Sequence, residues 1–552
     1  MPFPELLLRQ APPPGAGLSS RADVALFVGL VPRRANVAVP QEIRDWLEAA
    51  GWAGHGPFAR SPANVEALLD VPVPIESWGA FEHLFAWDQR LVRAGSPQHI
   101  PCPLGLAVRG FFQAGGVRAY VVRTGDPLPL LSDASADQVI ATKRRLVSWA
   151  DNGPPPDVAA RVPLIPGFLD LGHAAQATDP GTWHGMAHVW GVDEAAMLSL
   201  PDLPELFAGP PTPMPAIPAA PPVPEQFKPC APPTADFQPE AQVNRLAVSA
   251  PRLDRAGYRL WATAVQAVLG LLSVPNATAH RRDVMLVASL PLPSFEAGLV
   301  PAQAETWPLA VLDEAGIPAP GERLTDAARI GNARLQLAWP WVETAASAAL
   351  PEGVEGAEGA VLGAIARTSL LVGAFRSAAD TVLPDIRRLL PEPSIGALRR
   401  GLPDGRADWV GDRLTVIGKR PSGFVLLSDA TMSTSRIWRA AGVSRLMGII
   451  LRAARFLGQD RLFEPSGPKL WIAIRRDFES FLERLRQAGA VDGETTDEAY
   501  LVRCDRTTMT QNDIDAGRVI VAITFTAAEP VERITVTLAL GQSAGLIARE
   551  AA

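Results

Sequence analysis

The chain has 552 residues, of which 47% are hydrophobic and 20% charged, and its formal net charge is −7. This composition is that of a globular protein with a large core, and the length suggests about three or four domains. The lack of a basic block argues against nucleic-acid binding, which needs a stripe of Lys and Arg. The three cysteines, Cys102, Cys230 and Cys504, lie too far apart for a disulfide framework or a metal-ligand spacing, which favours synthesis in a reducing cytosol.

The first 20 residues, MPFPELLLRQAPPPGAGLSS, contain several prolines and a single Arg that follows a short apolar run. This is not the pattern of a secretory signal, and we expect an extended arm that its prolines keep from folding back. The longest apolar runs, Val265–Val274 and Val361–Phe375, are too short or are interrupted by Arg367, so no membrane insertion is expected.

Helices and strands alternate through the first two thirds of the chain, a pattern that indicates an α/β sheet with helices packed on it. A helix from Leu104 contains apolar residues at helical spacing and is expected to end at Gly115 and Gly116. The other expected elements are strands at Leu26–Val31, Val117–Val122, Ala196–Leu200 and Val284–Leu290, a strand and helix within Ile75–Leu84, and a helix at Leu253–Leu272.

The segment from Pro210 to Pro233 is dominated by proline and alanine. Such a tract prefers polyproline II and excludes both a helix interior and a sheet ladder. We therefore expect a Pro-rich insertion at residues 209–240. Two interpretations of this insertion stay open: a surface loop that acts only as a spacer, or a segment with a function of its own.

Two histidines, His184 and His188, are separated by four residues in HGMAH, a spacing that can hold zinc on a helix. A zinc protease would need Glu at position 185, which is Gly, and a third ligand. We therefore expect no metal site and interpret both residues as histidines on the solvent side of a helix.

Other chemistry is not indicated by the sequence. Asn512–Gly517 resembles a calcium loop but lacks the distal bidentate Glu, so a turn is expected. No G-x-S-x-G elbow, P-loop or G-x-G-x-x-G is present. Glu464 and Asp505 are interpreted as carboxylates that cap turns or pair with Arg445 or Arg518. We expect no catalytic residue, no cofactor and no metal.

Long helices are predicted at Arg436–Leu457 and Ile472–Gln487. In the second helix Phe478, Phe481, Leu482 and Leu485 form one apolar stripe, and Gly489 should end it. A short strand at Ala499–Cys504 follows, and then a turn-rich stretch.

The chain closes on two runs with a period of two. Val519, Val521, Ile523 and Phe525 alternate with smaller or polar residues, and Ile534, Val536, Leu538 and Leu540 do the same after Pro530. Two interpretations stay open for the last run: an internal hairpin, or a strand donated to a neighbouring molecule, where main-chain bonds give affinity.

The segment FLERLRQAGA…EAYLVRCDRTTMTQNDIDAGRVIVAITF resembles the C-terminal domain of contractile tail sheath proteins of phages, R-type bacteriocins and related injection systems. The matching residues include Phe481, Gly489, Asp505, Asp513 and Gly517. Upstream, LGLAVRGFFQAGGVRAYVVRTGD resembles a second block of that family through Gly115, Gly116 and Tyr120, and FEPSGPKLW a third that ends at Trp471. The family's NGG is Ala114-Gly115-Gly116 here, and its FEPN ends in Ser466.

The resemblance implies an α/β and α+β multidomain protein. Its middle domain would be a subtilisin-like α/β domain without the protease triad, followed by an α+β C-terminal sheath domain, with extended N- and C-terminal strand arms. The expected regions are an arm at 1–20, a strand–helix region at 21–160, the middle domain at 161–410, the sheath domain at 411–529 and a strand arm at 530–552.

The implied function is that of a structural subunit that polymerises as stacked hexameric rings around an inner tube and contracts to drive the tube through a target envelope. Its partners would be further copies of itself, the inner tube protein, and baseplate and terminator or cap proteins, with no nucleic acid. Assembly would begin in the cytoplasm, and the particle, a phage tail or bacteriocin-like machine, could be released. The alternatives are a subtilisin-like-fold hydrolase and a non-contractile tail scaffold protein.

Overall fold

A computed structural model describes residues 21–52, 68–149, 161–214, 246–273, 280–294, 307–318, 332–393, 398–401, 405, 407–461, 464–528, 534–540 and 547–551. In 459–460, 534–540 and 547–551 only the backbone is described. The expected N-terminal arm, Cys230 and most of the Pro-rich insertion lie outside these ranges.

The larger part of the molecule is built on an eight-stranded sheet with the order β16-β15-β10-β8-β6-β1-β5-β2. The inner strands pair in parallel, whereas the outer strands β2 and β16 pair antiparallel with β5 and β15. The strands are β1 Ala25–Leu30, β2 Val73–Ile75, β5 Ala119–Gly125, β6 Met197–Ser199, β8 Met285–Ser289, β10 Leu335–Trp339, β15 Thr415–Arg420 and β16 Gly423–Leu426. We call this part the α/β body.

Helices cover both faces of the sheet, and each face has its own apolar cluster. The inner strands are therefore buried on both sides, as in β1, where every residue is buried. The helices of the body are α1 Gln41–Ala49, α2 Trp78–Leu84, α3 Pro103–Gln113, α4 Ala136–Val147, α5 Leu203–Phe207, α6 Arg255–Leu272, α7 Trp307–Glu314, α8 Glu358–Leu371 and α9 Val410–Arg413.

The body also contains short two-stranded sheets. They are β3 Arg90–Leu91 with β4 His99–Ile100, β7 Arg252–Leu253 with β9 Leu292–Pro293, β11 Trp341–Glu343 with β12 Arg388–Leu390, and β13 Arg399–Gly401 with β14 Ala407–Trp409. Among the described residues, 3-10 helices lie at η6 Leu171–His173, η7 Pro180–Thr182, η8 Gly185–Gly191, η9 Ser347–Ala349 and η10 Pro351–Gly353.

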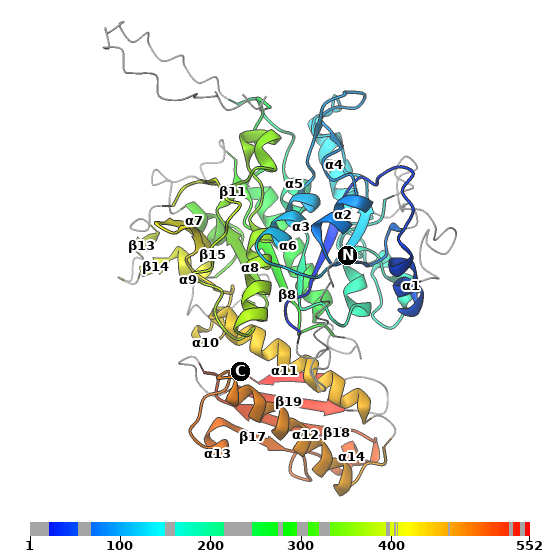
Figure 1. Ribbon diagram of the computed structural model, residues 1–552, viewed down its shortest axis with the longest axis vertical. Helices are drawn as coiled ribbons and strands as arrows, with labels where there is room; N and C mark the ends of the chain where they lie inside the picture. Colours follow the sequence, from blue (N-terminus) through cyan, green and yellow to red (C-terminus); the bar gives the residue numbers. More distant parts are fainter. Residues whose placement is uncertain are drawn as a thin grey trace, which may run out of the picture.

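A second, smaller unit follows the body and lies at one end of the molecule (Figure 1). Its four-stranded sheet has the order β17-β18-β19-β20. The elements of this C-terminal domain are α10 Arg436–Arg439, α11 Ala441–Asp460, α12 Pro468–Gln487, α13 Thr496–Ala499, α14 Gln511–Asp515, β17 Tyr500–Arg503, β18 Val519–Phe525, β19 Ile534–Leu540 and β20 Ile547–Ala551.

The predicted α/β sheet with flanking helices and the mixed multidomain fold are confirmed, with element ends shifted by a few residues. The prediction of a single helix at Arg436–Leu457 is wrong in one respect. The helix is interrupted at Ala440, whose extended backbone separates α10 from α11. The body sheet includes β15 and β16, so it continues across the boundaries expected at 160 and 410.

The Pro-rich insertion leaves and re-enters the body at one place. Pro213 and Val248 form an antiparallel bridge, and the Met214 backbone N–H donates to the Ala247 carbonyl at 3.1 Å. The two ends of the segment are therefore held side by side, as expected for an insertion between two elements of the body.

Candidate assembly site

The C-terminal domain places its apolar residues on one side of its sheet. In β18 Val519, Val521, Ile523 and Phe525 are buried, whereas the residues between them are only partly buried. The buried side packs against α11 and α12. Phe478 and Leu482, from the apolar stripe of α12, belong to the same apolar cluster as the buried residues of β18. The period of two in the sequence therefore corresponds to one covered and one open face of the sheet.

The open face carries a groove along β17 and β18 with about 850 Å³ of empty space. Its floor includes Leu501 and Arg503 of β17 and their cross-strand partners Thr524 and Ala522. Leu501 is 44% exposed although it is apolar. Within the described residues β17 and β20 are the outer strands of this sheet, so the domain offers both an open face and strand edges for association. Sequence reasoning missed this groove, because Ala499–Cys504 alternates too briefly to show a face.

Strand β19 pairs within its own chain. Its register joins Ile534, Val536, Leu538 and Leu540 to Phe525, Ile523, Val521 and Val519 of β18. On its other side β19 pairs with β20, a strand that the sequence pattern does not predict. The sequence IAREA of β20 contains few strand formers, which explains why it was missed. The single chain thus adopts the internal-hairpin alternative, and strand donation stays a prediction.

Local capping holds the stretch between β17 and β18. Thr510 and Asp513 form a capping box at α14, and Arg518 pairs with Asp513 at 2.6 Å. Asp505 Oδ1 accepts from the Thr507 backbone N–H at 2.7 Å, as expected for a carboxylate that caps a turn. The pKa of Asp505 is lowered by its hydrogen bonds, above all the one from the Thr507 side chain. The pKa of Asp513 is lowered in the same way, above all by the hydrogen bond from the Thr510 side chain. The segment predicted as a turn, Asn512–Gly517, instead forms most of this short helix and has a turn only at Ala516 and Gly517.

Two glycines of the family pattern end helices in a left-handed conformation. Gly489 has φ 73° directly after the α12 cap, and the Ala490 backbone N–H donates to the Leu485 carbonyl at 2.9 Å. Gly517 has φ 67° after α14, and the Arg518 backbone N–H donates to the Asp513 carbonyl. Glycine adopts these angles with the least strain, so both residues have a local structural reason.

The family-pattern residues of the body occupy a helix end and a buried strand. Gly115 has φ 109° after α3, and a Cβ on Gly116 would lie 2.3 Å from the Phe111 ring. Tyr120 on β5 is buried against the Trp46 ring, and Arg118 donates to its hydroxyl at 2.9 Å. In the C-terminal domain Trp471 is buried in the apolar cluster, and Phe481 is partly buried beside it. The role of all these residues in assembly stays a prediction.

The prediction for the HGMAH histidines is wrong for His188, which is fully buried in the 3-10 helix η8. Asp70, far away in sequence, lies between the two histidines, 2.6 Å from His184 Nδ1 and 2.9 Å from His188 Nε2. Burial raises the pKa of Asp70, but the two histidines outweigh burial and the net pKa falls. No group suited to hold a metal ion is found among the described residues.

The alternative that pairs Glu464 with Arg445 is wrong, because each of the two has another partner. Glu464 pairs with Arg461 at 3.1 Å, because both lie in the turn between α11 and α12. Arg445 pairs at 2.6 Å with Asp429, which precedes α10.

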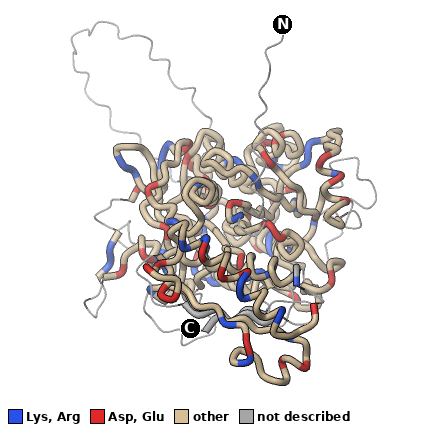
Figure 2. The backbone as a smooth tube through the Cα atoms, turned by 60° about the horizontal axis from the view of Figure 1, so that its bottom comes forward, with Lys and Arg blue, Asp and Glu red and all other residues tan. Residues whose placement is uncertain are grey.

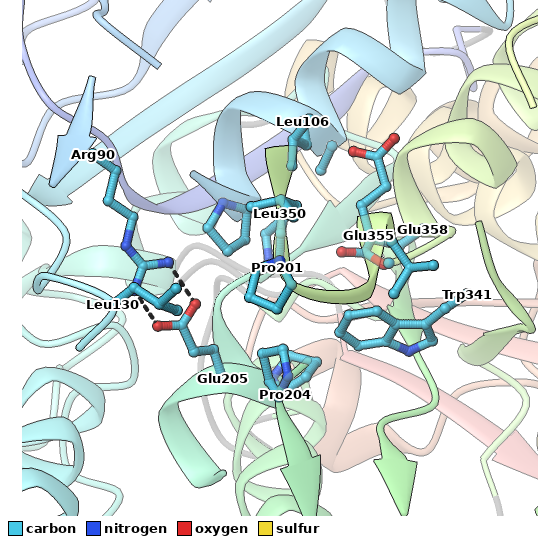
Figure 3. A pocket seen from close by; sticks show the side chains of 16 residues that line it. Arg90, Leu106, Leu130, Pro201, Pro204, Glu205, Trp341, Leu350, Glu355 and Glu358 are labelled. Carbon is cyan, nitrogen blue, oxygen red and sulfur yellow. Dashed lines mark hydrogen bonds and ion pairs between the residues drawn. The ribbon is translucent and has the colours of Figure 1, made fainter. Parts of the chain in front are cut away.

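A second hollow lies in the body, near the carboxyl ends of its parallel strands (Figure 3). Its walls are mainly apolar and include Leu106, Pro201 and Trp341, and it has about 580 Å³ of empty space. Arg90 and Glu205 form a buried bidentate ion pair at one end, and the carboxyl groups of Glu355 and Glu358 border the other.

The charges are mixed over the molecule. Figure 2 shows Lys and Arg interspersed with Asp and Glu along the described chain. None of the described helices combines the length and the apolar character needed to cross a bilayer.

Comparison with known proteins finds a family match in the C-terminal domain. Residues 433–541 match the model of the phage tail sheath C-terminal domain. No curated protein matches the chain in sequence at a significant level.

Several solved structures are similar over nearly the whole chain. A chain of the anti-feeding prophage (AFP) baseplate in the contracted state is 17% identical, with a TM-score of 0.53, and the similarity covers 96% of this chain and 95% of that chain. The contracted AFP helical sheath has a TM-score of 0.48 at 19% identity, with 96% and 97% covered. The contracted sheath complex of PVC, an extracellular contractile injection system, has a TM-score of 0.47 at 12% identity, with 96% and 95% covered.

The family match covers the segment whose residues resemble the sheath pattern, and it confirms that resemblance. The likeness to the AFP baseplate chain shows that the fold is shared beyond this segment. Residues 433–541 therefore match the phage tail sheath C-terminal domain, and the chain as a whole resembles the contractile tail sheath proteins.

Proposed function

We propose that the chain is a structural subunit of a contractile tail sheath, which polymerises as stacked hexameric rings around an inner tube. Contraction of the sheath drives the tube through a target envelope. The observation that carries this proposal is the match of residues 433–541 to the phage tail sheath C-terminal domain. In this proposal the α/β body includes a subtilisin-like middle domain that faces outward, and the C-terminal domain faces the tube.

The proposed mechanism is a change between two packings of the same subunits rather than a reaction. Each subunit contributes a modest gain in interface free energy on contraction, and the gains add along the tube. The partners are further copies of the chain, the inner tube protein, and baseplate and terminator or cap proteins. Assembly begins in the cytoplasm, and the finished particle can be released from the cell.

Strand exchange would keep neighbouring subunits connected while they rotate. The β18–β19 ladder depends on main-chain hydrogen bonds, each contributing about 0.5–1.5 kcal/mol net. A neighbour's residues 534–540 can make the same pairs with β18 that β19 makes within the single chain. We propose that the C-terminal strand, and the arm at 1–20, extend the C-terminal sheets of neighbouring subunits in this way.

Electron microscopy of the purified protein tests the function. We expect wide, ridged cylinders in negative stain for the full chain. Deletion of residues 534–552 should leave a soluble, folded body whose sheath formation is lost, and Val536→Pro should act in the same direction because it removes a ladder donor.

Two results would count against these proposals. Tubular sheaths formed by the deletion variant would exclude strand exchange but leave the sheath function standing. A full chain that stays monomeric at all concentrations, also with its tube protein added, would contradict the sheath function itself.

A further inference from the structure

Helix α11 separates the two parts of the molecule and presents a different surface to each (Figure 1). Toward the C-terminal sheet it presents apolar residues that are buried in the core of that domain, namely Val443, Leu446, Met447, Ile450, Leu451 and Ala454. Toward the α/β body it presents Gly442, Arg445, Gly448, Arg452 and Arg455. Their spacings of three or four residues place them on one stripe of the helix.

The first arginine of this stripe contacts the body near the end of its sheet. Arg445 pairs with Asp429 at 2.6 Å, and both side chains are almost fully buried. It also donates to the carbonyls of Ala374 and Arg376, each at 2.8 Å. A single guanidinium thus joins α11 to two segments of the body.

The other two arginines meet at Asp283, two residues before β8. Arg455 donates to Asp283 Oδ1 at 2.8 Å and to the His280 carbonyl at 2.9 Å. Arg452 donates to the Asp283 carbonyl at 3.0 Å. On the body side Arg281 contacts the same carboxylate at 3.2 Å. Asp283 therefore lies among three guanidinium groups, with Asp23 and Asp193 near enough to offset part of their charge.

The glycines of the stripe let the two parts approach closely. A Cβ on Gly442 would lie 2.3 Å from the Phe375 carbonyl oxygen, and one on Gly448 would lie 2.8 Å from the Asp283 carbonyl oxygen. Both contacts are with backbone, which cannot rotate away. An apolar contribution comes from Ile449, which is buried in a cluster of the body.

We propose that this glycine and arginine stripe is a polar joint, across which the C-terminal domain and the α/β body change their relative orientation while both apolar cores, apart from the Ile449 side chain, stay closed. Opening an apolar core exposes surface to water without compensation. Separated arginine and aspartate side chains instead regain their hydration, so a buried ion pair contributes little net stability relative to the separated groups. A contact of this kind separates more readily than either core.

The charged groups at the joint have opposing effects on its opening. The pKa of Arg452 is lowered to about 10, mainly by burial and also by Arg281 and Arg455, against the opposing effect of Asp283. A cation whose pKa is lowered in the closed state favours the open, hydrated state, whereas the lowered pKa of Asp283 and the raised pKa of Arg455 favour the closed state.

Distances between two spin labels measure the orientation directly in the full chain. The labels are placed at Lys419→Cys on the body and Ala516→Cys on the C-terminal domain, both exposed positions. Cys230 is replaced by Ser in all samples, whereas Cys102 and Cys504 are buried. The parent should give one narrow distance distribution in pulsed electron paramagnetic resonance.

Two variants weaken the joint in different ways. Arg452→Met removes a charge from it, whereas Gly448→Ala adds a Cβ against the Asp283 carbonyl and at the same time favours the helix. We expect both to broaden the label distance or shift it by several ångströms, with unchanged amide-exchange protection in β8 and β18. Gly270→Ala, at a helical glycine with open space around it, is the matched control and should leave the distance unchanged.

An unchanged distance distribution in both variants would overturn the proposal. So would a simultaneous loss of protection in β8 and β18, because the two parts would then be one cooperative unit. The measurement uses the isolated chain, so its outcome does not depend on whether the protein forms sheaths.

Discussion

Buried carboxyl groups lie at the edge of the body sheet where its parallel strands end. Asp202 accepts from the Leu30 backbone N–H at 2.8 Å, and Glu355 contacts the Thr344 hydroxyl at 2.6 Å. Burial is the largest cause that raises the pKa of Asp202 to about 7 and that of Glu355 to about 8. A carboxyl group with a raised pKa is held protonated by the fold, because the interior disfavours its charged form.

These shifts predict that the protein loses stability as the pH rises from acidic to mildly alkaline values. A Glu whose pKa is raised on folding stabilises the folded state below its unfolded pKa, and this contribution is lost as pH rises through the folded pKa. The parent should therefore become less stable between about pH 5 and pH 8. Glu355→Gln keeps a hydrogen-bonding group and should reduce this loss by up to about 4 kcal/mol.

Thermal unfolding across this pH range checks the prediction. Glu479→Gln, at a position more than a third exposed on α12, is the control and should retain the pH dependence of the parent. Equal pH dependence in the parent and Glu355→Gln would show that Glu355 is ionised in the folded protein.

At the scale of elements, the body relies on close helix packing. Helix α8 contacts α3 through Gly359 and Gly363, which are four residues apart and lie on one face. A Cβ on Gly359 would lie 2.2 Å from the Ala107 carbonyl oxygen, and one on Gly363 would lie 2.3 Å from the Phe111 carbonyl oxygen. The two helix backbones therefore touch where any side chain would separate them.

Gly363→Ala should destabilise the protein although alanine is the better helix former. Overpacking costs about 1–3 kcal/mol, which exceeds the gain of about 0.5–1 kcal/mol in helix propensity. Gly270→Ala on α6 should gain helix propensity without any cost of overpacking, because its Cβ would meet no atom within 4 Å. We expect the two substitutions to shift the midpoint of chemical unfolding in opposite directions, and a shared direction would contradict the packing argument.

At the scale of the whole molecule, the C-terminal domain projects from the body and leaves one face of its sheet open (Figure 1). The groove around Leu501 is the described surface on which a neighbouring subunit could pack against that sheet. An exposed apolar residue beside strand edges is typical of a surface used for association.

Leu501→Glu should reduce assembly without unfolding the subunit. The side chain is 44% exposed, and substitutions at such positions change stability by about 0.5 kcal/mol or less. A charge in the groove opposes burial against a neighbour. Leu371→Glu, at a 70% exposed position on α8, is the control. Sedimentation and negative-stain microscopy should show fewer polymers for Leu501→Glu only; equal polymer yields would exclude the groove from the interface.

The sequence by itself determined the features that depend on neighbouring residues. The covered face of β18, the apolar stripe of α12 and the helix end at Gly489 follow from periodicity and from backbone preferences. The family resemblance of the C-terminal domain came from the same local pattern of strands, turns and glycines. Such features require no knowledge of distant parts of the chain.

Tertiary structure decided what depends on residues far apart in sequence. Asp70 meets His188, which buries a histidine expected in solvent. Asp283 meets Arg452 and thereby connects the two parts of the molecule. The pairing of β19 with β18 and β20 was likewise open, because alternation indicates a strand but not its partner. Pairing and burial are set by the free energy of contacts across the fold, which a local pattern does not contain.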